Sequence, residues 1–339
     1  MSIKVAPVGH SRILSVGTYR PKRQVPNSEI VDRIDSTDEW IVQRTGIESR
    51  RFAGDDETVI SMAKAACEMA LKRAKLTIAD IDTVILSTIS YPFQAPSAAT
   101  ELINELGNPK AAAFDISAAC AGFCYGVAMG SDLVRSGTSK NVLVIGVEKL
   151  SDYTDPDDRA TAFIFADGAG AVVIGQSDQP RIGQTIWGSD ADSRDAIMLT
   201  PSFLDFKKNP DKGVGELGWP NISQQGQVVF RWAVYSMSKV GLQALEAAGV
   251  SVDELGAFIP HQANIRIIET MAKEMKIPDS VLIADDIRTN GNTSAASIPL
   301  AMDRILEEHP ELHGKLALLI GYGAGLVYAG QVVELPPAP

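Results

Sequence analysis

Residues that bind metals or form disulfides are scarce in this sequence. Among its 339 residues it has only three cysteines and four histidines. An odd number of cysteines, with Cys120 and Cys124 close together, does not form a disulfide framework. Paired C-x2-C and H-x3-H spacings, which are typical of zinc sites, are also absent. We therefore expect a reducing, cytoplasmic location and no bound metal.

Long apolar runs and an excess of positive charge are missing as well. No stretch approaches ~18 uninterrupted apolar residues, so we expect no transmembrane helix. The N-terminal segment MSIKVAPVGHSRIL has no continuous apolar core, so we expect no secretory signal. The net charge is −11, whereas a nucleic-acid surface needs a basic face, so we expect no nucleic-acid partner. An acidic partner would require a local basic patch.

The chain repeats itself over a long distance. The segment ALKRAKLTIADIDTVILSTI begins at residue 70, and ALEAAGVSVDELGAFIPHQA begins 174 residues later (244 − 70 = 174). Each consists of a helix end, a turn with an acidic pair and an apolar strand. Three further pairs follow in the same order: AFDIS (113–117) with ADDIR (284–288), VAMGSDLV (127–134) with LAMDRIL (300–306), and KNVLVIG (140–146) with KLALLIG (315–321). One such match is common between α/β units, but four in order indicate a duplication.

These matches predict an α/β protein built from two homologous halves, residues 1–175 and 176–339. The strands VLVIG and ALLIG are continuous apolar runs, as expected of sheets that are covered on both faces. We therefore expect five layers, α-β-α-β-α, with one buried helix from each half in the middle layer. The candidates for these two helices follow AFDIS and ADDIR and are rich in small residues, which let helices approach closely.

The most informative polar residues lie where strands end and helices begin. Cys120, in FDISAACAGFCYG, is expected at a helix N-terminus, where the helix dipole lowers a thiol pKa. His261 follows the strand FIP, and Asn292 lies in GNTS, on the turn equivalent to that of Cys120. Such sheet ends are where α/β proteins build their sites. The glycine-rich turn GYGAG can bring backbone N–H groups close to a ligand, and the strand that follows it excludes a dinucleotide site.

Each of these residues also has a purely structural interpretation. A cysteine among alanines is often a core residue, a histidine at a strand end is often only hydrogen-bonded, and NGN commonly forms turns. The duplication favours a functional site, because it places the candidates at equivalent sheet ends that face a shared cleft. For Cys124, one helical turn after Cys120, we favour packing.

Three motifs, DISAACAGF, IPHQANIRII and GNTSAASIP, closely resemble those of β-ketoacyl-acyl-carrier-protein synthase III, a thiolase-fold condensing enzyme of bacterial fatty-acid synthesis. The resemblance extends along nearly the whole chain, from DEWIVQRTGI (38–47) to GYGAGLVYAGQVV (321–333). The last segment is most similar to actinobacterial members. The resemblance implies the thiolase-like duplicated fold and an acyltransferase that needs no cofactor, because acyl-CoA is a substrate.

The resemblance also implies a role for each site residue. Cys120 is the nucleophile, which takes an acyl group from acyl-CoA as a thioester. His261 and Asn292 donate hydrogen bonds to the thioester oxygen of malonyl-acyl-carrier protein while carbon dioxide leaves and an enolate forms. The enolate attacks the acyl group, and the backbone N–H groups of Cys120 and Ala324 form the oxyanion hole. Asparagine at position 292 is typical of synthase III, whereas the elongating synthases have a second histidine.

Binding residues can be assigned in the same way. The family pattern places coenzyme A at Trp40, Arg44, Arg159 and Asn264, and the acyl or pantetheine channel at Phe230, Tyr322 and Ala95. For the acidic carrier protein we expect a basic patch of Arg231, Arg266, Lys273 and Lys276. Arg266 and Lys273 are seven residues apart and so share a helix face. A solvated helix face that also carries Glu269 and Glu274 is the alternative.

Ala95 departs from the family pattern, because relatives carry larger side chains there that close the acyl pocket of the partner subunit. A homodimer with a roomier pocket is therefore expected, accepting branched or longer primers. Three other functions remain open. A priming enzyme of a polyketide or other secondary pathway has the same chemistry. A Cys-His-Asn hydrolase leaves the duplication unexplained, and a non-catalytic binding protein would be expected to lack one of the three polar groups.

Overall fold

Two five-stranded sheets form the framework of the protein. The computed structural model describes residues 8–339, so the first seven residues of the N-terminal segment considered above lie outside the described residues. The strands of the first sheet are, in spatial order, β1 (His10–Tyr19), β7 (Asp167–Ser177), β6 (Asn141–Lys149), β4 (Thr83–Ser87) and β5 (Ala112–Ile116). Those of the second sheet are β12 (Leu282–Ile283), β11 (Leu255–Pro260), β13 (Leu316–Gly323), β14 (Val327–Glu334) and β8 (Ile186–Ser189).

The two sheets have the same internal arrangement. In the first, β5, β4 and β6 are parallel, and β7 and β1 continue the sheet in antiparallel pairs. In the second, β12, β11 and β13 are parallel, and β14 and β8 continue it in antiparallel pairs. The repeated segments KNVLVIG and KLALLIG form the corresponding strands β6 and β13. The duplicated α/β fold that the repeats predict is therefore confirmed.

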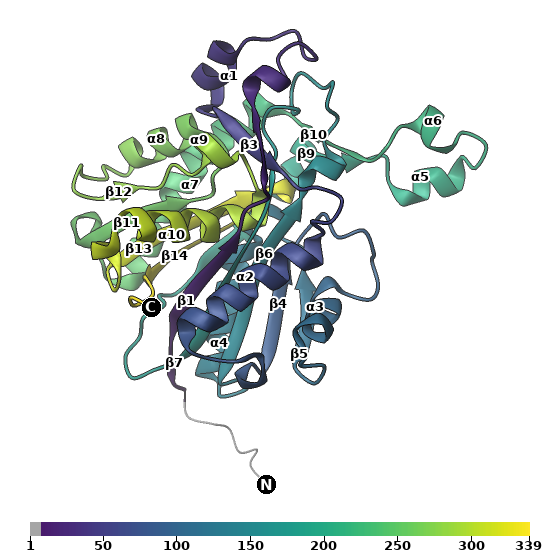
Figure 1. Ribbon diagram of the computed structural model, residues 1–339. Helices are drawn as coiled ribbons and strands as arrows, with labels where there is room; N and C mark the ends of the chain where they lie inside the picture. The colour runs from purple at the N-terminus through teal and green to yellow at the C-terminus, as the bar shows by residue number, and fades with distance from the viewer. Residues whose placement is uncertain (1–7) are drawn as a thin grey trace.

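Helices cover the outer faces of both sheets and fill the space between them (Figure 1). In the middle layer, α4 (Gly122–Arg135) contacts β6 and β13, and α10 (Ser297–Glu308) contacts β7 and β11. The first sheet is covered by α2 (Val59–Ala74) and α3 (Ala98–Leu106), and the second by α7 (Gly226–Ala248) and α8 (Ile265–Glu274). The layers follow the predicted order α-β-α-β-α, with the two small-residue helices in the middle.

Small residues make this close packing possible. Gly17 in β1 lies directly against α2, where an added Cβ would be 2.3 Å from the backbone nitrogen of Ala70. Gly126 in α4 lies against β6, where a Cβ would be 2.6 Å from Cγ1 of Val144. Since real Cβ contacts are not this short, only glycine allows these helices to approach the sheet so closely.

The halves are less separate than a single division point suggests. The expected division at residue 175 falls inside β7, which ends at Ser177. An early segment with β2 (Arg23–Pro26), α1 (Asp38–Thr45) and β3 (Ser49–Phe52) also packs on the second half. Ile41 and Ile47 of this segment share a core with Phe258 and Ile268. The N-terminal half therefore contributes part of the core that supports the second sheet.

The segment ADDIR does not form the same element as AFDIS, with which it aligns. AFDIS forms most of β5, but β12 ends at Ile283, so ADDIR forms a loop and the start of α9 (Ile287–Asn290). Asp286 is buried and its carboxylate receives hydrogen bonds from Arg20 and Asn290. A buried carboxylate needs such partners, which a loop can provide more readily than the interior of an apolar strand.

A slender arm extends from the body of the molecule (Figure 1). It carries the short helices α5 (Phe203–Lys208) and α6 (Gly213–Leu217). Its base is a two-stranded antiparallel sheet of β9 (Ile197–Thr200) and β10 (Asn221–Gln224). The side chains of Phe203 and Leu204 are about 60% exposed on this arm (61% and 60%).

Candidate active site

A cavity of about 550 Å³ is lined by residues of both halves. Cys120, His261 and Asn292 all line it, together with Tyr322 and Ala324. A concave pocket with a few converging polar groups is the usual form of a small-molecule site. The structure thus brings together the residues that the sequence placed at equivalent sheet ends.

Cys120 lies on a tight turn between β5 and α4. The turn is the short 3-10 helix η3 (Ala119–Ala121), and Ala119 has a left-handed backbone with φ of 44°. The second half repeats this turn in η7 (Ser294–Ala296), where Ser294 has φ of 49°. Left-handed backbone at a non-glycine residue is strained and is often found at functional sites. Two equivalent strained turns therefore face the same cavity.

The pKa of the Cys120 thiol is opposite to the sequence-based expectation. Burial raises this pKa to about 12, although hydrogen bonding to the Ser294 hydroxyl lowers it in part. Glu148, a buried carboxylate nearby, raises it further. The position at a helix start was correctly predicted, but removal from water disfavours the thiolate more than the turn favours it. Because Cys120 retains partial exposure to the cavity, a substrate can still reach its sulfur.

His261 is held in the neutral form with a defined orientation. Its Nδ1 lies 2.7 Å from Oγ of Ser297, and that same oxygen accepts a hydrogen bond from the backbone N–H of Gln262 at 3.3 Å. The Ser297 hydroxyl proton is then free to point at Nδ1, which leaves the ring proton on Nε2. Burial lowers the pKa of His261 to about 3. The ring therefore fits a neutral Nε2–H donor and not a general base.

Asn292 is fixed through both its backbone and its side chain. Its N–H donates to the carbonyl of Ile164 at 2.9 Å, and its carbonyl accepts from Ala166 N, also at 2.9 Å. The side-chain Oδ1 accepts from the backbone N–H of Ser294 at 2.9 Å. With Oδ1 engaged in this way, Nδ2 is the group that remains to donate to a ligand.

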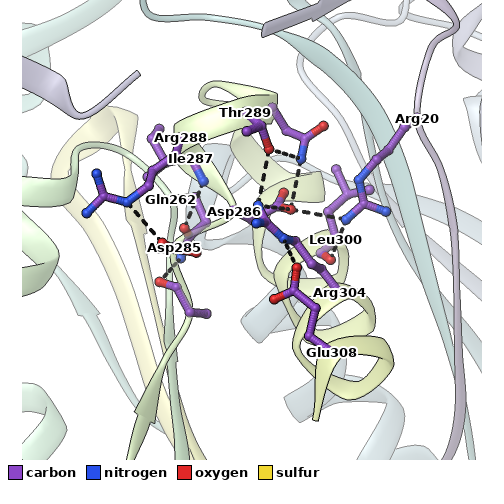
Figure 2. A network of polar contacts seen from close by, with 12 residues as sticks. Arg20, Gln262, Asp285, Asp286, Ile287, Arg288, Thr289, Leu300, Arg304 and Glu308 are labelled. Carbon is purple, nitrogen blue, oxygen red and sulfur yellow. Dashed lines mark hydrogen bonds and ion pairs between the residues drawn. The ribbon is translucent and has the colours of Figure 1, made fainter. Parts of the chain in front are cut away.

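A buried polar network supports the loop that carries His261 (Figure 2). Nε2 of Gln262 donates to the carbonyls of Pro260 and Ala284, at 2.8 Å and 3.2 Å. Its Oε1 accepts from the backbone N–H of Ile287 at 3.1 Å. Because Gln262 follows His261 directly, these bonds join the His261 loop to the start of α9.

The same network extends to the other end of α9 (Figure 2). Asp286 accepts from Nη2 of Arg20 at 3.1 Å and from Nδ2 of Asn290 at 2.9 Å, and Arg304 lies 3.7 Å away. Since α9 ends at Asn290, the loop with Asn292 begins directly after it. Both polar loops of the second half are therefore anchored to one cluster, to which Arg20 connects the first half.

The glycine-rich turn after β13 approaches the nucleophile closely. A Cβ added to Gly323 would lie 2.7 Å from the backbone nitrogen of Cys120 and 3.1 Å from its sulfur. Ala324 follows this glycine and lines the cavity. The backbone N–H groups of Cys120 and Ala324 thus come from two segments in direct contact, as an oxyanion hole requires.

The residues expected at the coenzyme A site gather at α1. The guanidinium carbons of Arg44 and Arg159 lie 5.6 Å and 5.9 Å from the centre of the Trp40 ring. Trp40 and Arg44 line the cavity, whereas Arg159 is exposed and lies 3.5 Å from Asp35. Asn264 also lines the cavity, but both ends of its side-chain amide already have partners within the protein. Its Oδ1 accepts from the backbone N–H of Arg266 and so caps α8, and its Nδ2 donates to the carbonyl of Arg44. The assignment to coenzyme A stays a prediction.

The residues assigned to the acyl channel divide into two groups. Phe230 and Tyr322 line the cavity, and the Tyr322 ring packs edge-on against His261 with 5.1 Å between ring centres. Ala95 is exposed and lies outside the cavity lining of its own chain. This position is compatible with the expected contact to a partner subunit.

The basic residues expected to contact a carrier protein are all exposed. They are Arg231, Arg266, Lys273 and Lys276. Arg266 lies over the Phe230 ring at 5.5 Å, at the lining of the cavity. Glu269 and Glu274 are exposed on the same helix α8, as the alternative interpretation noted. Its buried face consists of Ile265, Ile267, Ile268, Met271 and Ala272.

The sequence did not single out three polar residues that line the cavity or bond to its lining residues. These are Glu148, Ser294 and Ser297, all of them buried. Ser294 and Ser297 lie within the GNTSAAS motif, so their position beside Asn292 was available as an indication. Glu148 follows the apolar run NVLVIGV, and a glutamate at the end of a buried strand was the sign that could have identified it.

The part of the chain that the structure describes contains neither a cluster of metal ligands nor a membrane-spanning helix. Among residues 8–339, histidine, cysteine, aspartate and glutamate do not gather in groups of three or more that could hold a metal ion. Within the same residues, no helix is both long and apolar enough to cross a bilayer.

The duplicated fold with a cysteine, a histidine and an asparagine around one cavity defines a thiolase-fold condensing enzyme, that is, an acyltransferase. The family models for 3-oxoacyl-acyl-carrier-protein synthase III and for its C-terminal domain match residues 114–191 and 245–335. The chain is 54% identical to β-ketoacyl-acyl-carrier-protein synthase III 1 of Streptomyces coelicolor, over 96% of this chain and 97% of that protein. The chain therefore belongs to the β-ketoacyl-acyl-carrier-protein synthase III family.

Solved structures agree with this placement. The crystal structure of the priming β-ketosynthase from the R1128 polyketide biosynthetic pathway is similar with a TM-score of 0.96 and 42% identity, over 100% of both chains. The synthase III of Aquifex aeolicus is similar with a TM-score of 0.86 and 36% identity, over 96% of this chain and 99% of the other. The thiolase-like fold that the resemblance implies is thereby confirmed.

Proposed function

We propose that this protein condenses an acyl-CoA primer with malonyl-acyl-carrier protein, giving 3-oxoacyl-acyl-carrier protein, coenzyme A and carbon dioxide. This is the first condensation of fatty-acid synthesis. The observation that carries the proposal is the convergence of Cys120, His261 and Asn292 on one cavity with Gly323 against the nucleophile. Those groups match the needs of acyl transfer and of enolate formation.

In the first half of the reaction, the Cys120 sulfur attacks the acyl carbonyl of acyl-CoA and coenzyme A leaves. The carbonyl oxygen becomes an oxyanion, which the backbone N–H groups of Cys120 and Ala324 stabilise. Trp40 and Arg44 at the cavity lining can hold the nucleotide part of coenzyme A by stacking and by charge-assisted hydrogen bonds. The product is a thioester on Cys120 with an electrophilic carbon.

In the second half, the malonyl group loses carbon dioxide beside His261 and Asn292. Negative charge develops on the malonyl thioester oxygen, and Nε2–H of His261 and Nδ2 of Asn292 donate to it. Two neutral donors are sufficient, because decarboxylation leaves the electron pair on carbon without any proton being removed. The enolate carbon attacks the acyl-Cys120 carbonyl and releases the free cysteine.

The partners follow from the same proposal. The exposed cations Arg231, Arg266, Lys273 and Lys276 offer a local basic patch to an acidic carrier on a chain of net charge −11. We also propose a homodimer, because Phe93 is 62% exposed on the same loop as Ala95 and would be covered by a second copy. The free thiols of Cys67, Cys120 and Cys124 fit a reducing cytoplasm.

The test is condensation by the purified protein with acyl-CoA and malonyl-acyl-carrier protein, followed by mass spectrometry of the carrier. We expect 3-oxoacyl-carrier protein with isobutyryl-CoA or acetyl-CoA as primer. Hydrolysis of acyl-CoA without carbon–carbon bond formation would instead indicate a hydrolase.

Priming of a secondary pathway is a second candidate function. It is favoured by the likeness to the R1128 priming β-ketosynthase, which covers both chains completely. The condensation chemistry is the same in both cases, so the carrier decides between them. Faster condensation with a polyketide carrier protein than with the fatty-acid carrier protein of the same cell would favour this candidate.

A further inference from the structure

Glu148 at the end of β6 is an unusual residue, because it is a completely buried glutamate (0% exposed) that lies behind the cavity lining and contacts Ser294. Its Oε2 accepts from Oγ of Ser90 at 2.6 Å, from the backbone N–H of Ile89 at 3.1 Å and from Oγ1 of Thr88 at 3.2 Å. Its Oε1 accepts from Oγ of Ser294 at 3.1 Å. The roles assigned to Cys120, His261 and Asn292 do not use this carboxyl group.

The charged neighbours of Glu148 do not neutralise it. Within residues 8–339, no lysine or arginine forms an ion pair with it. The ammonium of the adjacent Lys149 points to the carbonyl of Gly54 at 3.0 Å and to Asp152 at 3.9 Å. The titratable groups that respond to its charge are the Cys120 thiol and the Tyr153 hydroxyl, both of which have a raised pKa partly because of Glu148. A buried carboxyl without a cation is costly, so it is a candidate for a functional role.

Ser294 connects this carboxyl group to the nucleophile. Its hydroxyl donates to Glu148 Oε1 at 3.1 Å, and its interaction with the Cys120 thiol lowers the pKa of that thiol. The turns η3 and η7 that carry Cys120 and Ser294 pack against each other, and both residues line the cavity. A hydroxyl that donates to a carboxylate and lies on a turn packed against that of a thiol can pass a proton between the two groups.

We propose that Glu148 accepts the thiol proton of Cys120 through the hydroxyl of Ser294, an inference that rests on the proposed condensing function. In the first half of the reaction, the S–H bond breaks, the proton goes to Ser294 Oγ, and the Ser294 proton goes to Glu148. The sulfur forms a bond to the acyl carbon, the bond from that carbon to coenzyme A sulfur breaks, and coenzyme A takes a proton from water. In the second half, condensation releases a Cys120 thiolate, which regains its proton from Glu148 through Ser294.

Charge conservation in the buried cluster is the physical reason for this route. A thiolate formed by loss of the proton to water would add a second negative charge beside the Glu148 carboxylate. Transfer to Glu148 keeps one negative charge in the cluster throughout. Burial raises the pKa of Glu148 to about 7, so the carboxyl group can both accept and return a proton near neutral pH.

The two possible roles of Glu148 predict effects of opposite sign. A passive anion only hinders thiolate formation, so its removal would make Cys120 more reactive. A proton acceptor promotes thiolate formation, so its removal makes Cys120 less reactive. Alkylation by iodoacetamide forms an S–C bond at Cys120, expels iodide and needs neither coenzyme A nor a carrier protein. It therefore tests the relay even if the proposed condensing function is wrong.

The experiment measures the rate of Cys120 alkylation from pH 5 to pH 9 in the wild-type protein, Glu148→Gln, Ser294→Ala and the double variant. Peptide mass spectrometry separates Cys120 from the other two thiols. We expect the wild-type rate to rise with an apparent pKa near that of Glu148, about 7. We expect both single variants to be about tenfold slower at pH 8 and to lack this transition, and the double variant to be no slower than either.

Three outcomes would overturn the relay: faster alkylation of Glu148→Gln, unchanged alkylation of Ser294→Ala, or a transition near pH 7 that persists in both. If Glu148→Gln does not fold, as judged by thermal unfolding, the pH profile of Ser294→Ala decides by itself. Single-turnover acylation by acetyl-CoA is measured in parallel. Normal alkylation behaviour without acylation would count against the condensing function and leave the relay standing.

Discussion

At the scale of single residues, burial favours the neutral forms of both Cys120 and His261. It raises the pKa of the Cys120 thiol to about 12 and lowers that of His261 to about 3, so both groups are neutral at pH 7. A neutral thiol needs help to react, whereas a neutral imidazole is the form that donates through Nε2. This difference fits a nucleophile at Cys120 and a neutral hydrogen-bond donor at His261.

Truncation of the two donors should separate the half reactions. We expect His261→Ala and Asn292→Ala to slow decarboxylation of malonyl-acyl-carrier protein about a hundredfold each, because each removes a donor to the developing enolate oxygen. Acylation of Cys120 should change much less, since neither donor takes part in it. Single-turnover measurements of both steps check this, and equal losses in both steps would contradict the assignment.

The lowered pKa of His261 also has a consequence for stability. Above pH 6.5, the ordinary pKa of histidine, His261 adds nothing to the pH dependence of the free energy of unfolding. It is neutral there in both the folded and the unfolded chain. Below that pH the unfolded chain takes up a proton that the folded chain does not, so the folded state loses stability progressively down to pH 3. We expect the free energy of unfolding, measured with urea, to fall between pH 7 and pH 5 by about 2 kcal/mol more in the wild type than in His261→Ala. The same loss in both proteins would show that His261 has an ordinary pKa.

At the scale of elements, the site depends on how closely the turns approach the sheets. Gly146 in β6 illustrates this, because an added Cβ would lie 2.1 Å from the carbonyl oxygen of Ala295 in η7. Only glycine at position 146 therefore lets η7, which carries Ser294, lie so close to β6. The Asn292 loop directly precedes this turn.

Substitution of this glycine should affect both stability and chemistry. We expect Gly146→Ala to reduce the free energy of unfolding by about 1–3 kcal/mol and to slow decarboxylation, because the methyl group must displace η7. Gly215→Ala is the matched control, since nothing lies within 4 Å of a Cβ at that position. Urea unfolding and the decarboxylation rate measure the two effects. Normal values of both for Gly146→Ala would mean that the turn can move without consequence.

Elements and their ends were predictable where local chemistry determines them. Asn264 begins α8 because its side chain caps the first turn, and VYAGQVV forms the strand β14, as its apolar pattern indicates. The sequence did not indicate that ADDIR forms a loop where AFDIS forms a strand, because the partners of ADDIR, above all Arg20, are distant in sequence. The raised pKa of Cys120 was not predictable either, because burial is a property of the whole fold. The family pattern supplied the residues that we predict to bind coenzyme A and the carrier protein, whereas contacts such as Ser294 with Glu148 required the structure.

At the scale of the whole molecule, duplication explains why the site lies where it does. The two halves place equivalent turns, around Cys120 and around Asn292, at one cavity between two packed sheets. The sequence repeats were sufficient to predict this arrangement and its five layers. They were not sufficient to predict that the early segment with Ile41 and Ile47 packs on the second half, because no repeat covers it.

The primer range is a property of the assembled protein. Ala95 is exposed in the chain, and in the proposed homodimer its small side chain leaves space in the partner's acyl pocket. We expect octanoyl-CoA and isobutyryl-CoA to acylate the protein at rates within about tenfold of acetyl-CoA. Ala95→Phe should reduce the rates with both larger primers and leave the acetyl rate nearly unchanged. Strict preference of the wild type for acetyl-CoA would contradict the assignment of Ala95.

Intact-protein mass spectrometry after incubation with mixed acyl-CoA thioesters shows whether Cys120 carries the acyl group. The wild-type chain should gain the mass of one acyl group, which peptide analysis should place on Cys120. Cys120→Ala should gain none. An acyl group on Cys120→Ala, or a wild-type chain that stays unmodified, would show that Cys120 is not the acyl carrier.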